Sequence, residues 1–312
     1  MENGFLYIRS HGVSNQLIDA VYEQARCFFA QDNGFKGRYY IGNSPNHRGY
    51  VPVSEKGDYS DEQGPRRYEA FDMGVDLPAD DPDFLAGNPL LGPNTWPDQP
   101  GFRYILGRYF REVRRIGMTM CRAFEIALEL PEGHFRQHMT KPISQLRLLH
   151  YLANERPESA TDFNMGAHTD YECFTILHSK NPALQILDLD SKWVDAPPID
   201  NTFYFNIGDM LEAWSGGLLV ATAHRVANRG DERFSMPYFQ ATNFDTVVSP
   251  VNCPKFASQQ SDYPPVIAGA HLLSQLLRDF PYMRRRYEAG LLKVPSLQPG
   301  PNPFENRISQ NM

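Results

Sequence analysis

The amino-acid sequence predicts a mainly β fold with buttressing helices, in which a helical N-terminal portion packs on a C-terminal β core. Three observations support this class. Two segments before residue 131 have apolar residues spaced by three or four, which indicates helices. After residue 142 come short runs rich in β-branched and aromatic residues, which indicate strands. With 312 residues, 41% of them hydrophobic, the chain can bury a sizeable core.

The N-terminal portion should begin with a strand and a helix. Residues 4–13 (GFLYIRSHGV) are typical of a strand that ends in a turn at Gly12. Residues 15–30 carry one apolar stripe and predict a helix. Residues 31–100 are rich in Gly, Pro, Asp and Asn, so they predict mostly loop, with one strand at 68–73.

Residues 101–130 form the longest predicted helix, which ends at Pro131 because proline cannot continue a helix. The runs after residue 142 are spaced as in a sandwich or barrel. They are 145–152, 174–179, 184–189, 202–208 and 234–244. A last helix is predicted over residues 269–290.

We expect one domain over residues 1–312, because no stretch has the composition of a linker. Its three parts are a helical portion at 1–141, a β core at 142–268, and a C-terminal helix with a tail at 269–312.

Charge and cysteine content narrow the setting. A net charge of −7 argues against nucleic acid or an anionic membrane surface as the main partner. No apolar run approaches the roughly 20 residues of a membrane span, and the N-terminus lacks the features of a signal peptide. The scattered cysteines form no paired motif, so we expect a reduced, cytoplasmic location.

The segment GAHTDYECFTIL (residues 166–177) is the first candidate for function. It reads as a buried strand, in which residues two apart face the same side, so His168 and Asp170 should project together. Burial of a carboxylate beside an imidazole is costly unless something compensates, and a divalent cation would compensate both. The alternative is a hydrogen-bonded pair at the surface of an edge strand.

A metal site needs a third ligand from another strand, and His224 is the best of the nine histidines. Arg233 and Ser235 follow it, two residues apart on a predicted strand, where a guanidinium and a hydroxyl could hold a carboxylate. Two histidines and one carboxylate leave open positions, as in non-haem ferrous oxygenases. The two features together suggest a dicarboxylate that bridges metal and arginine. A structural ion pair is the alternative for Arg233 and Ser235.

Taken in order, these motifs resemble the 2-oxoglutarate- and iron(II)-dependent oxygenases related to isopenicillin N synthase. In the C-terminal half the resemblance rests on HTD, FTILH, LQIL, KWVDAPP, FYFNIGDMLEAWSGG, HRV and RFS. In the N-terminal half it rests on GFLYIRSHGV, RGYVPV, YEAFDMG and GPNTWP. Relatives usually carry a further strand and helix before the segment that matches GFLYIRSHGV.

The resemblance implies a distorted double-stranded β-helix, or jelly roll, as the core of a single oxygenase domain. It implies Fe(II) held by His168, Asp170 and His224, with 2-oxoglutarate as co-substrate and O2 as oxidant. Arg233 and Ser235 match the motif that grips the distal carboxylate of 2-oxoglutarate.

Tyr151 matches a tyrosine that often adds a hydroxyl to the same carboxylate, although a tyrosine of the core is an alternative interpretation. In many relatives an asparagine stands two residues before that tyrosine. Leu149 stands there in this sequence, so one polar contact to the co-substrate should be missing.

The resemblance implies an enzyme of specialised metabolism that hydroxylates, desaturates or cyclises a small organic molecule and releases succinate and CO2. One alternative is an iron oxidase or cyclase of the isopenicillin N synthase kind that does not use 2-oxoglutarate; another is a non-catalytic binding module. We expect a monomer. The fold does not define the substrate.

Four residues are candidate substrate contacts: Tyr171, Glu172, Phe174 and Phe244. If the strand alternation continues, Glu172 and Phe174 share the metal-facing side. Tyr171 would then turn outward, unless the strand ends there.

Overall fold

The computed structural model describes residues 4–55, 68–153, 163–260 and 263–292. Its strands are β1 (Phe5–Arg9), β2 (Gly49–Val51), β3 (Tyr68–Gly74), β4 (Gln145–Tyr151), β5 (Phe163–His168), β6 (Phe174–Ser179), β7 (Leu184–Leu187), β8 (Trp193–Asp195), β9 (Thr202–Ile207), β10 (His224–Ala227), β11 (Arg233–Gln240), β12 (Val247–Val248) and β13 (Val266–Ile267).

The α-helices are α1 (Asn15–Phe29), α2 (Asn33–Gly37), α3 (Pro82–Leu85), α4 (Phe102–Ala127), α5 (Asp209–Trp214), α6 (Ala268–Asp279) and α7 (Pro281–Glu288). Short 3-10 helices are η1 (Ile41–Asn43), η3 (Arg136–His138) and η4 (Pro254–Gln259).

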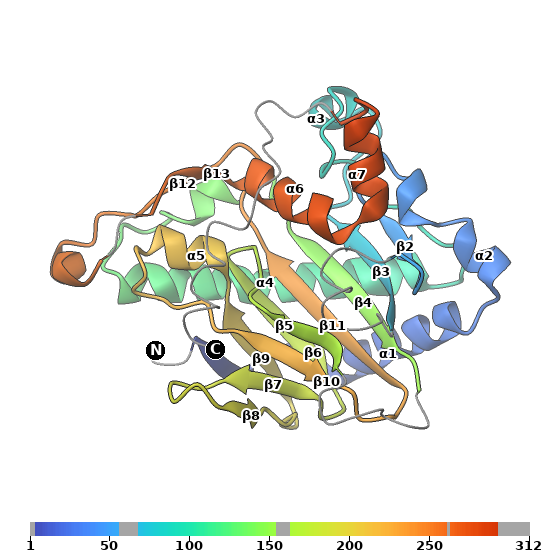
Figure 1. Cartoon of the computed structure of the whole chain (residues 1–312), viewed down its shortest axis with the longest axis horizontal. Helices are drawn as coiled ribbons and strands as arrows, with labels where there is room; N and C mark the ends of the chain where they lie inside the picture. The colour runs from blue at the N-terminus through green and yellow to red at the C-terminus, as the bar shows by residue number, and fades with distance from the viewer. Residues whose placement is uncertain (1–3, 56–67, 154–162, 261–262, 293–312) are drawn as a thin grey trace.

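Two antiparallel sheets form the centre of the described part of the chain (Figure 1). The larger has seven strands in the order β1-β9-β6-β11-β4-β3-β2, and the smaller has four in the order β5-β10-β7-β8. Residues of both sheets line one cavity between them. The mainly β fold with a jelly-roll core is therefore confirmed. The cavity between its two sheets is where a site can form.

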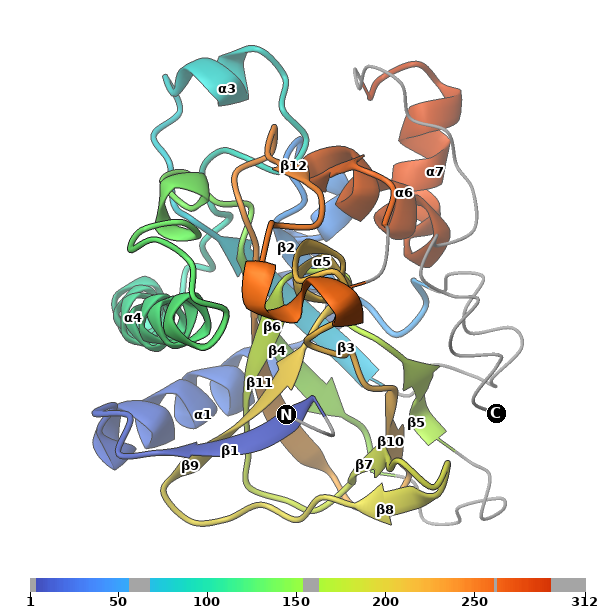
Figure 2. The same cartoon turned by 90° about the vertical axis from the view of Figure 1, so that its left-hand side faces the viewer.

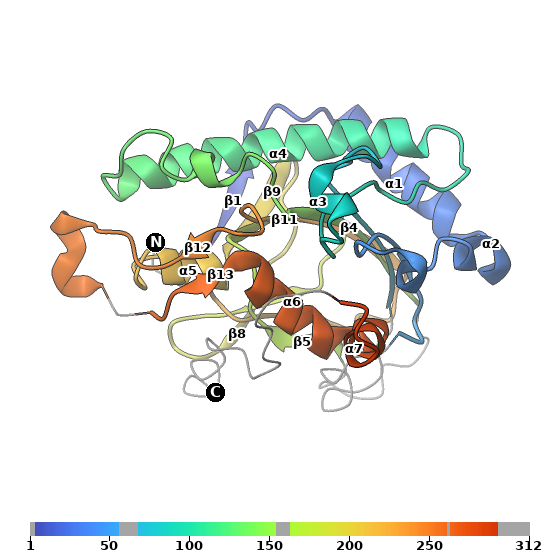
Figure 3. The same cartoon turned by 90° about the horizontal axis from the view of Figure 1, so that it is seen from above.

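Helices α1 and α4 lie side by side against the larger sheet, on the face opposite the smaller sheet (Figure 2, Figure 3). Helix α6 lies at one end of the sheets, where Leu272 and Leu276 line the cavity. Among the described residues, no helix is both long and apolar enough to cross a bilayer.

The two long helices begin where local chemistry favours it. The Ser14 hydroxyl accepts a hydrogen bond from the Leu17 amide (3.2 Å) and so caps α1. Gly101 precedes α4 with a φ of 82°, a conformation that glycine adopts at little cost. Helix α4 ends at Ala127, a few residues before Pro131.

Aromatic side chains fill the layer between these helices and the larger sheet. The Phe28 ring of α1 lies 4.9 Å from Phe71 of β3 and 5.7 Å from Phe102 of α4, measured between centroids. All three side chains are buried. This packing covers and stabilises one face of the larger sheet. The opposite face is the one that lines the cavity.

Residues 166–177 are not one strand. Strand β5 ends at His168 and β6 begins at Phe174. The turn between them is held by α5, because the amide of Asp209 donates to the carbonyl of Asp170 (2.8 Å). The predicted strand is therefore wrong over these turn residues.

The predicted C-terminal helix is two helices. Helix α6 ends at Asp279, and α7 begins with Pro281, which cannot donate the hydrogen bond that continuation of α6 would need. The expected tail beyond residue 292 lies outside the described residues. In the segment expected to be mostly loop, the strand at 68–73 is confirmed and extends to Gly74, and α2, η1, β2 and α3 are also present.

Candidate metal centre

The ends of two neighbouring strands bring the predicted metal ligands together. His168 at the end of β5 pairs directly with His224 at the start of β10. Asp170 follows in the turn after β5. One potential ligand atom from each of the three side chains lies within 4.8 Å of the other two. We call His168, Asp170 and His224 the metal triad. Its convergence agrees with the prediction, but it comes from a strand pair and a turn and not from alternation along one strand.

Hydrogen bonds orient both imidazoles of the metal triad. His168 Nδ1 donates to the carbonyl of Gly166 (2.8 Å), and His224 Nδ1 donates to the carbonyl of Thr222 (3.3 Å). The opposite nitrogens, Nε2, lie 3.8 and 3.7 Å from Oδ1 of Asp170. Since a carbonyl only accepts, each Nε2 carries a lone pair when the ring is neutral.

The carboxylate of Asp170 is oriented in the same way. Its Oδ2 accepts hydrogen bonds from the hydroxyl of Thr175 and from Nδ2 of Asn206 (2.7 Å), which leaves Oδ1 to face the imidazoles. Burial raises the pKa of Asp170, but the imidazoles and these two donors outweigh burial and hold the pKa below its ordinary value. The carboxylate is therefore charged at neutral pH.

Burial also lowers the pKa of His168 to about 4. A neutral imidazole and a charged carboxylate are the forms in which these side chains bind metal. The donor set of two nitrogens and one oxygen on one side therefore fits a divalent transition-metal ion such as Fe(II).

A buried guanidinium lies in the same cavity. Arg233 on β11 stands opposite Tyr151 on β4, and its Cζ lies 3.6 Å from the centroid of the Tyr151 ring. Arg233 is only 4% exposed, yet its Nε and Nη2 have no hydrogen-bond partner among the described residues. Buried donors are almost always paired, so this group fits an anionic ligand that supplies acceptors.

The neighbours of Arg233 line the same cavity. Ser235 and Tyr151 do so, and so does Leu149, whose side chain offers no polar atom. The cavity has a volume of about 180 Å³. Its apolar walls include Leu177, Leu184, Val226 and Phe239.

The candidate substrate contacts divide into two groups. Tyr171 and Glu172 line the cavity, because the strand ends before them and the turn directs both side chains inward. Phe174 does not line it: it is 1% exposed and packs against Phe205, with centroids 5.0 Å apart. Phe244 does not line it either, and packs against Gly269 at the start of α6.

Glu172 has an unusual electrostatic environment. Burial, followed by the charge of Asp170, raises the pKa of the Glu172 carboxyl to about 8. It lines the cavity close to the metal triad.

Arg147 also lines the cavity, although sequence reasoning did not select it. The signal was present, because residues two apart in a strand share a face. Counting back from Tyr151 along β4 gives Leu149, Arg147 and Gln145, and all of them line the cavity. Asn206 and Thr175, which hold Asp170, also went unselected.

Comparison with known proteins identifies the family. Residues 142–242 match the family model described as the 2OG-Fe(II) oxygenase superfamily. Residues 1–99 match the model described as the N-terminal region of a non-haem dioxygenase in morphine synthesis.

Two curated relatives illustrate the similarity. A homoarginine-6-hydroxylase of Oryza sativa subsp. japonica is 32% identical over 290 residues, which cover 89% of this chain and 86% of the relative. The 2-oxoglutarate-Fe(II) type oxidoreductase hxnY of Emericella nidulans is 30% identical over 277 residues, which cover 85% of this chain and 78% of the relative.

Solved structures show the same fold. A 2OG-Fe(II) oxygenase family protein of Caulobacter crescentus superposes with a TM-score of 0.74 at 28% identity, covering 92% of this chain and 90% of that one. A full-length protein of Neurospora crassa, in complex with alpha-KG and thymine, superposes with a TM-score of 0.75 at 23% identity, covering 92% and 88%. The chain thus belongs to the 2OG-Fe(II) oxygenase superfamily and is an iron(II)- and 2-oxoglutarate-dependent oxidoreductase.

Proposed function

We propose that the metal triad holds Fe(II) in this enzyme, and that Arg233, Ser235 and Tyr151 hold the distal carboxylate of 2-oxoglutarate. One observation carries the proposal: a buried guanidinium with two unpaired nitrogens lies in the same cavity as the triad. A dicarboxylate that ligates the metal at one end would satisfy those nitrogens at the other. Leu149, beside them, adds no polar contact.

We further propose that the enzyme hydroxylates a small organic molecule in this cavity. Bound Fe(II) would supply the oxidising chemistry with O2 as the oxidant: one oxygen atom would enter succinate as 2-oxoglutarate loses CO2, and the other would enter the hydroxylated product. The residues of the chain bind and orient the reactants, and the apolar walls at Leu177, Val226 and Phe239 exclude water. Several relatives are named as hydroxylases, and a cavity of about 180 Å³ suits a small substrate.

Arg233→Ala tests the co-substrate site. Anaerobic addition of Fe(II) and 2-oxoglutarate to the wild-type protein should give a weak visible charge-transfer band, whose titration yields the dissociation constant for 2-oxoglutarate. Hydrogen bonds to charged groups contribute about 1.5–3 kcal/mol, so Arg233→Ala should weaken 2-oxoglutarate binding by about 100-fold. Arg233→Lys should give an intermediate value, because it keeps the charge but loses the planar fork.

Arg229→Ala is the matched control. Arg229 is 43% exposed and pairs with Asp195 on the smaller sheet, outside the cavity lining. This variant should bind 2-oxoglutarate as the wild-type protein does. Equal affinity of the Arg233→Ala and wild-type proteins would refute the assigned role. A screen of small molecules for succinate release, beginning with homoarginine and thymine, then identifies the substrate by the mass of its product.

A further inference from the structure

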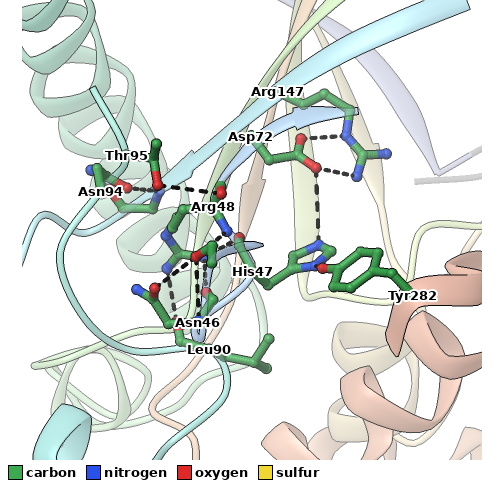
Figure 4. A network of polar contacts seen from close by, with 11 residues as sticks. Asn46, His47, Arg48, Asp72, Leu90, Asn94, Thr95, Arg147 and Tyr282 are labelled. Carbon is green, nitrogen blue, oxygen red and sulfur yellow. Dashed lines mark hydrogen bonds and ion pairs between the residues drawn. The ribbon is translucent and has the colours of Figure 1, made fainter. Parts of the chain in front are cut away.

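A second arginine lines the cavity, on the face of β4 that also carries Leu149 and Tyr151. Arg147 stands directly opposite Asp72 of β3. Its Nε donates to Oδ1 of Asp72 (2.6 Å) and its Nη2 to Oδ2 (2.9 Å). Figure 4 shows both contacts as dashed lines. This bidentate ion pair fixes the plane of the guanidinium.

The carboxylate of Asp72 is buried beside a histidine of the segment before β2. Its Oδ2 lies 3.9 Å from Nε2 of His47, and Nδ1 of His47 is hydrogen-bonded to the hydroxyl of Tyr282 at the start of α7 (Figure 4). Both Asp72 and His47 are fully buried. Burial lowers the pKa of His47 to about 3, so this imidazole is neutral and brings no charge. Arg147 is therefore the close cationic partner of Asp72 among the described residues.

The remaining nitrogen of Arg147 is not used by the protein. Nη1 makes no hydrogen bond to any described residue, although Nε and Nη2 are both occupied by Asp72. Nη1 carries two N–H donors, and the Arg147 side chain is 16% exposed where it lines the cavity. The guanidinium thus offers donors to a molecule inside the cavity, at an orientation that Asp72 sets.

Two carboxyl groups of the same cavity can accept hydrogen bonds from a bound molecule, whereas Arg147 can only donate them. Glu172 is 5% exposed, and its side chain forms no hydrogen bond or ion pair with another described residue. Asp279 of α6 also lines the cavity and accepts a hydrogen bond from the hydroxyl of Tyr171 (3.2 Å). Since the charge of Arg147 is already matched by Asp72, a substrate that brings an N–H group would give the buried Glu172 carboxyl a hydrogen-bond partner that the described residues do not supply, because a carboxyl oxygen accepts in either protonation state.

We propose that Arg147 is a substrate-binding residue positioned by Asp72, and that Arg147 and Glu172 together select a small molecule that carries both an oxygen acceptor and a nitrogen-borne N–H donor. An amino acid and a cyclic amide are examples of this class. The oxygen would accept from Nη1 of Arg147, and the N–H group would donate to Glu172. This inference rests on the proposed function, because it assigns the substrate side of the same cavity.

The substrate class is tested with a library of small molecules divided into four groups. Compounds in the first group carry both an oxygen acceptor and an N–H donor; those in the other groups carry an acceptor only, a donor only, or neither. Sets such as norleucine, hexanoic acid and pentylamine, or 2-piperidone, cyclohexanone and piperidine, keep the linear or six-membered-ring skeleton similar while the polar groups change. The strongest stimulation of succinate release by the wild-type enzyme should come from the first group. Strongest stimulation from any other group, or none from the first, overturns the proposal.

The role of Arg147 is tested with the strongest compound from that screen. Loss of a charge-assisted hydrogen bond in Arg147→Met should raise the KM for this compound roughly 10- to 100-fold. Arg147→Lys should restore part of the loss, and Asp72→Asn should raise the same KM because the guanidinium is no longer held. Glu172→Leu should raise the same KM, because leucine offers no acceptor to the N–H group.

Two measurements separate this role from a merely structural one. Arg147→Met should keep its dissociation constant for 2-oxoglutarate within about twofold of the wild-type value, since Arg233 is untouched. Arg229→Met, outside the cavity, should change neither constant. An unchanged substrate KM in Arg147→Met contradicts the assignment. If the wild-type protein does not bind 2-oxoglutarate, the proposed function itself has failed, and this inference fails with it.

Discussion

At the scale of single residues, the metal triad depends on side chains that lie behind it. Thr175 of β6 and Asn206 of β9 are direct partners across neighbouring strands, and both donate to Oδ2 of Asp170. One pair of residues on the larger sheet therefore sets the direction of a carboxylate that belongs to the turn after β5. Groups of this kind fix the orientation of a ligand and increase its affinity for metal.

Thr175→Val should weaken metal binding without a large loss of stability. The substitution keeps the shape of the side chain but removes one donor to Asp170. Loss of such a supporting contact typically reduces metal affinity 10- to 100-fold. Calorimetric titration of the apoprotein with Mn(II) measures the effect. Thr119→Val is the control, because Thr119 is exposed on α4 and, among the described residues, its hydroxyl donates to the Arg115 carbonyl alone. Equal Mn(II) affinity of wild type and Thr175→Val would contradict this role.

At the scale of elements, the sequence allowed most strands and both long helices to be predicted, since their periodicity is strong. It did not show where β5 ends, because Tyr171, Glu172 and Cys173 are also compatible with a strand. The side on which the residues after Asp170 lie was therefore predicted wrongly for Phe174, which was expected in the cavity. Arg147 could be placed on the cavity face by alternation from Tyr151, but its partner Asp72 is 75 residues away in sequence.

No residue of helix α4 lines the cavity, so its core residues should affect stability more than chemistry. Leu106 is fully buried on α4, and Leu106→Ala should lower the free energy of unfolding by about 2–5 kcal/mol. Ile126→Ala on the same helix should change it by less than about 0.5 kcal/mol, because Ile126 is 63% exposed. Urea denaturation measures both. Similar losses in the two variants would show that α4 does not pack as described.

At the scale of the whole molecule, a buried polar cluster ties the N-terminal portion to the β core. Glu69 of β3 pairs with Lys36 of α2 (2.8 Å) and accepts hydrogen bonds from Tyr50 of β2 and from His150 of β4 (2.8 Å). Nε2 of His150 also contacts Glu232 (2.7 Å), just before β11. Segments far apart in the sequence thus share one carboxylate.

This shared carboxylate should make the stability of the molecule sensitive to acid. Burial raises the pKa of Glu69, but the hydrogen bonds from His150, Lys36 and Tyr50 outweigh burial and hold the pKa below its ordinary value. A carboxyl group with a lowered pKa in the folded state stabilises that state above the pKa of the unfolded chain, about 4.3. The stabilisation is lost as pH falls through the folded-state pKa.

Glu69→Gln should therefore lower the free energy of unfolding at pH 7 by about 2 kcal/mol, and the difference from wild type should shrink as pH falls below about 4. Urea denaturation at a series of pH values between 7 and 3 measures the difference directly. Glu132→Gln is the matched control: Glu132 is 80% exposed, so its difference from wild type should stay near zero throughout. A Glu69→Gln difference that is the same at pH 3 and pH 7 would mean that the loss comes from packing. The charge on Glu69 would then contribute nothing to holding the N-terminal portion on the β core.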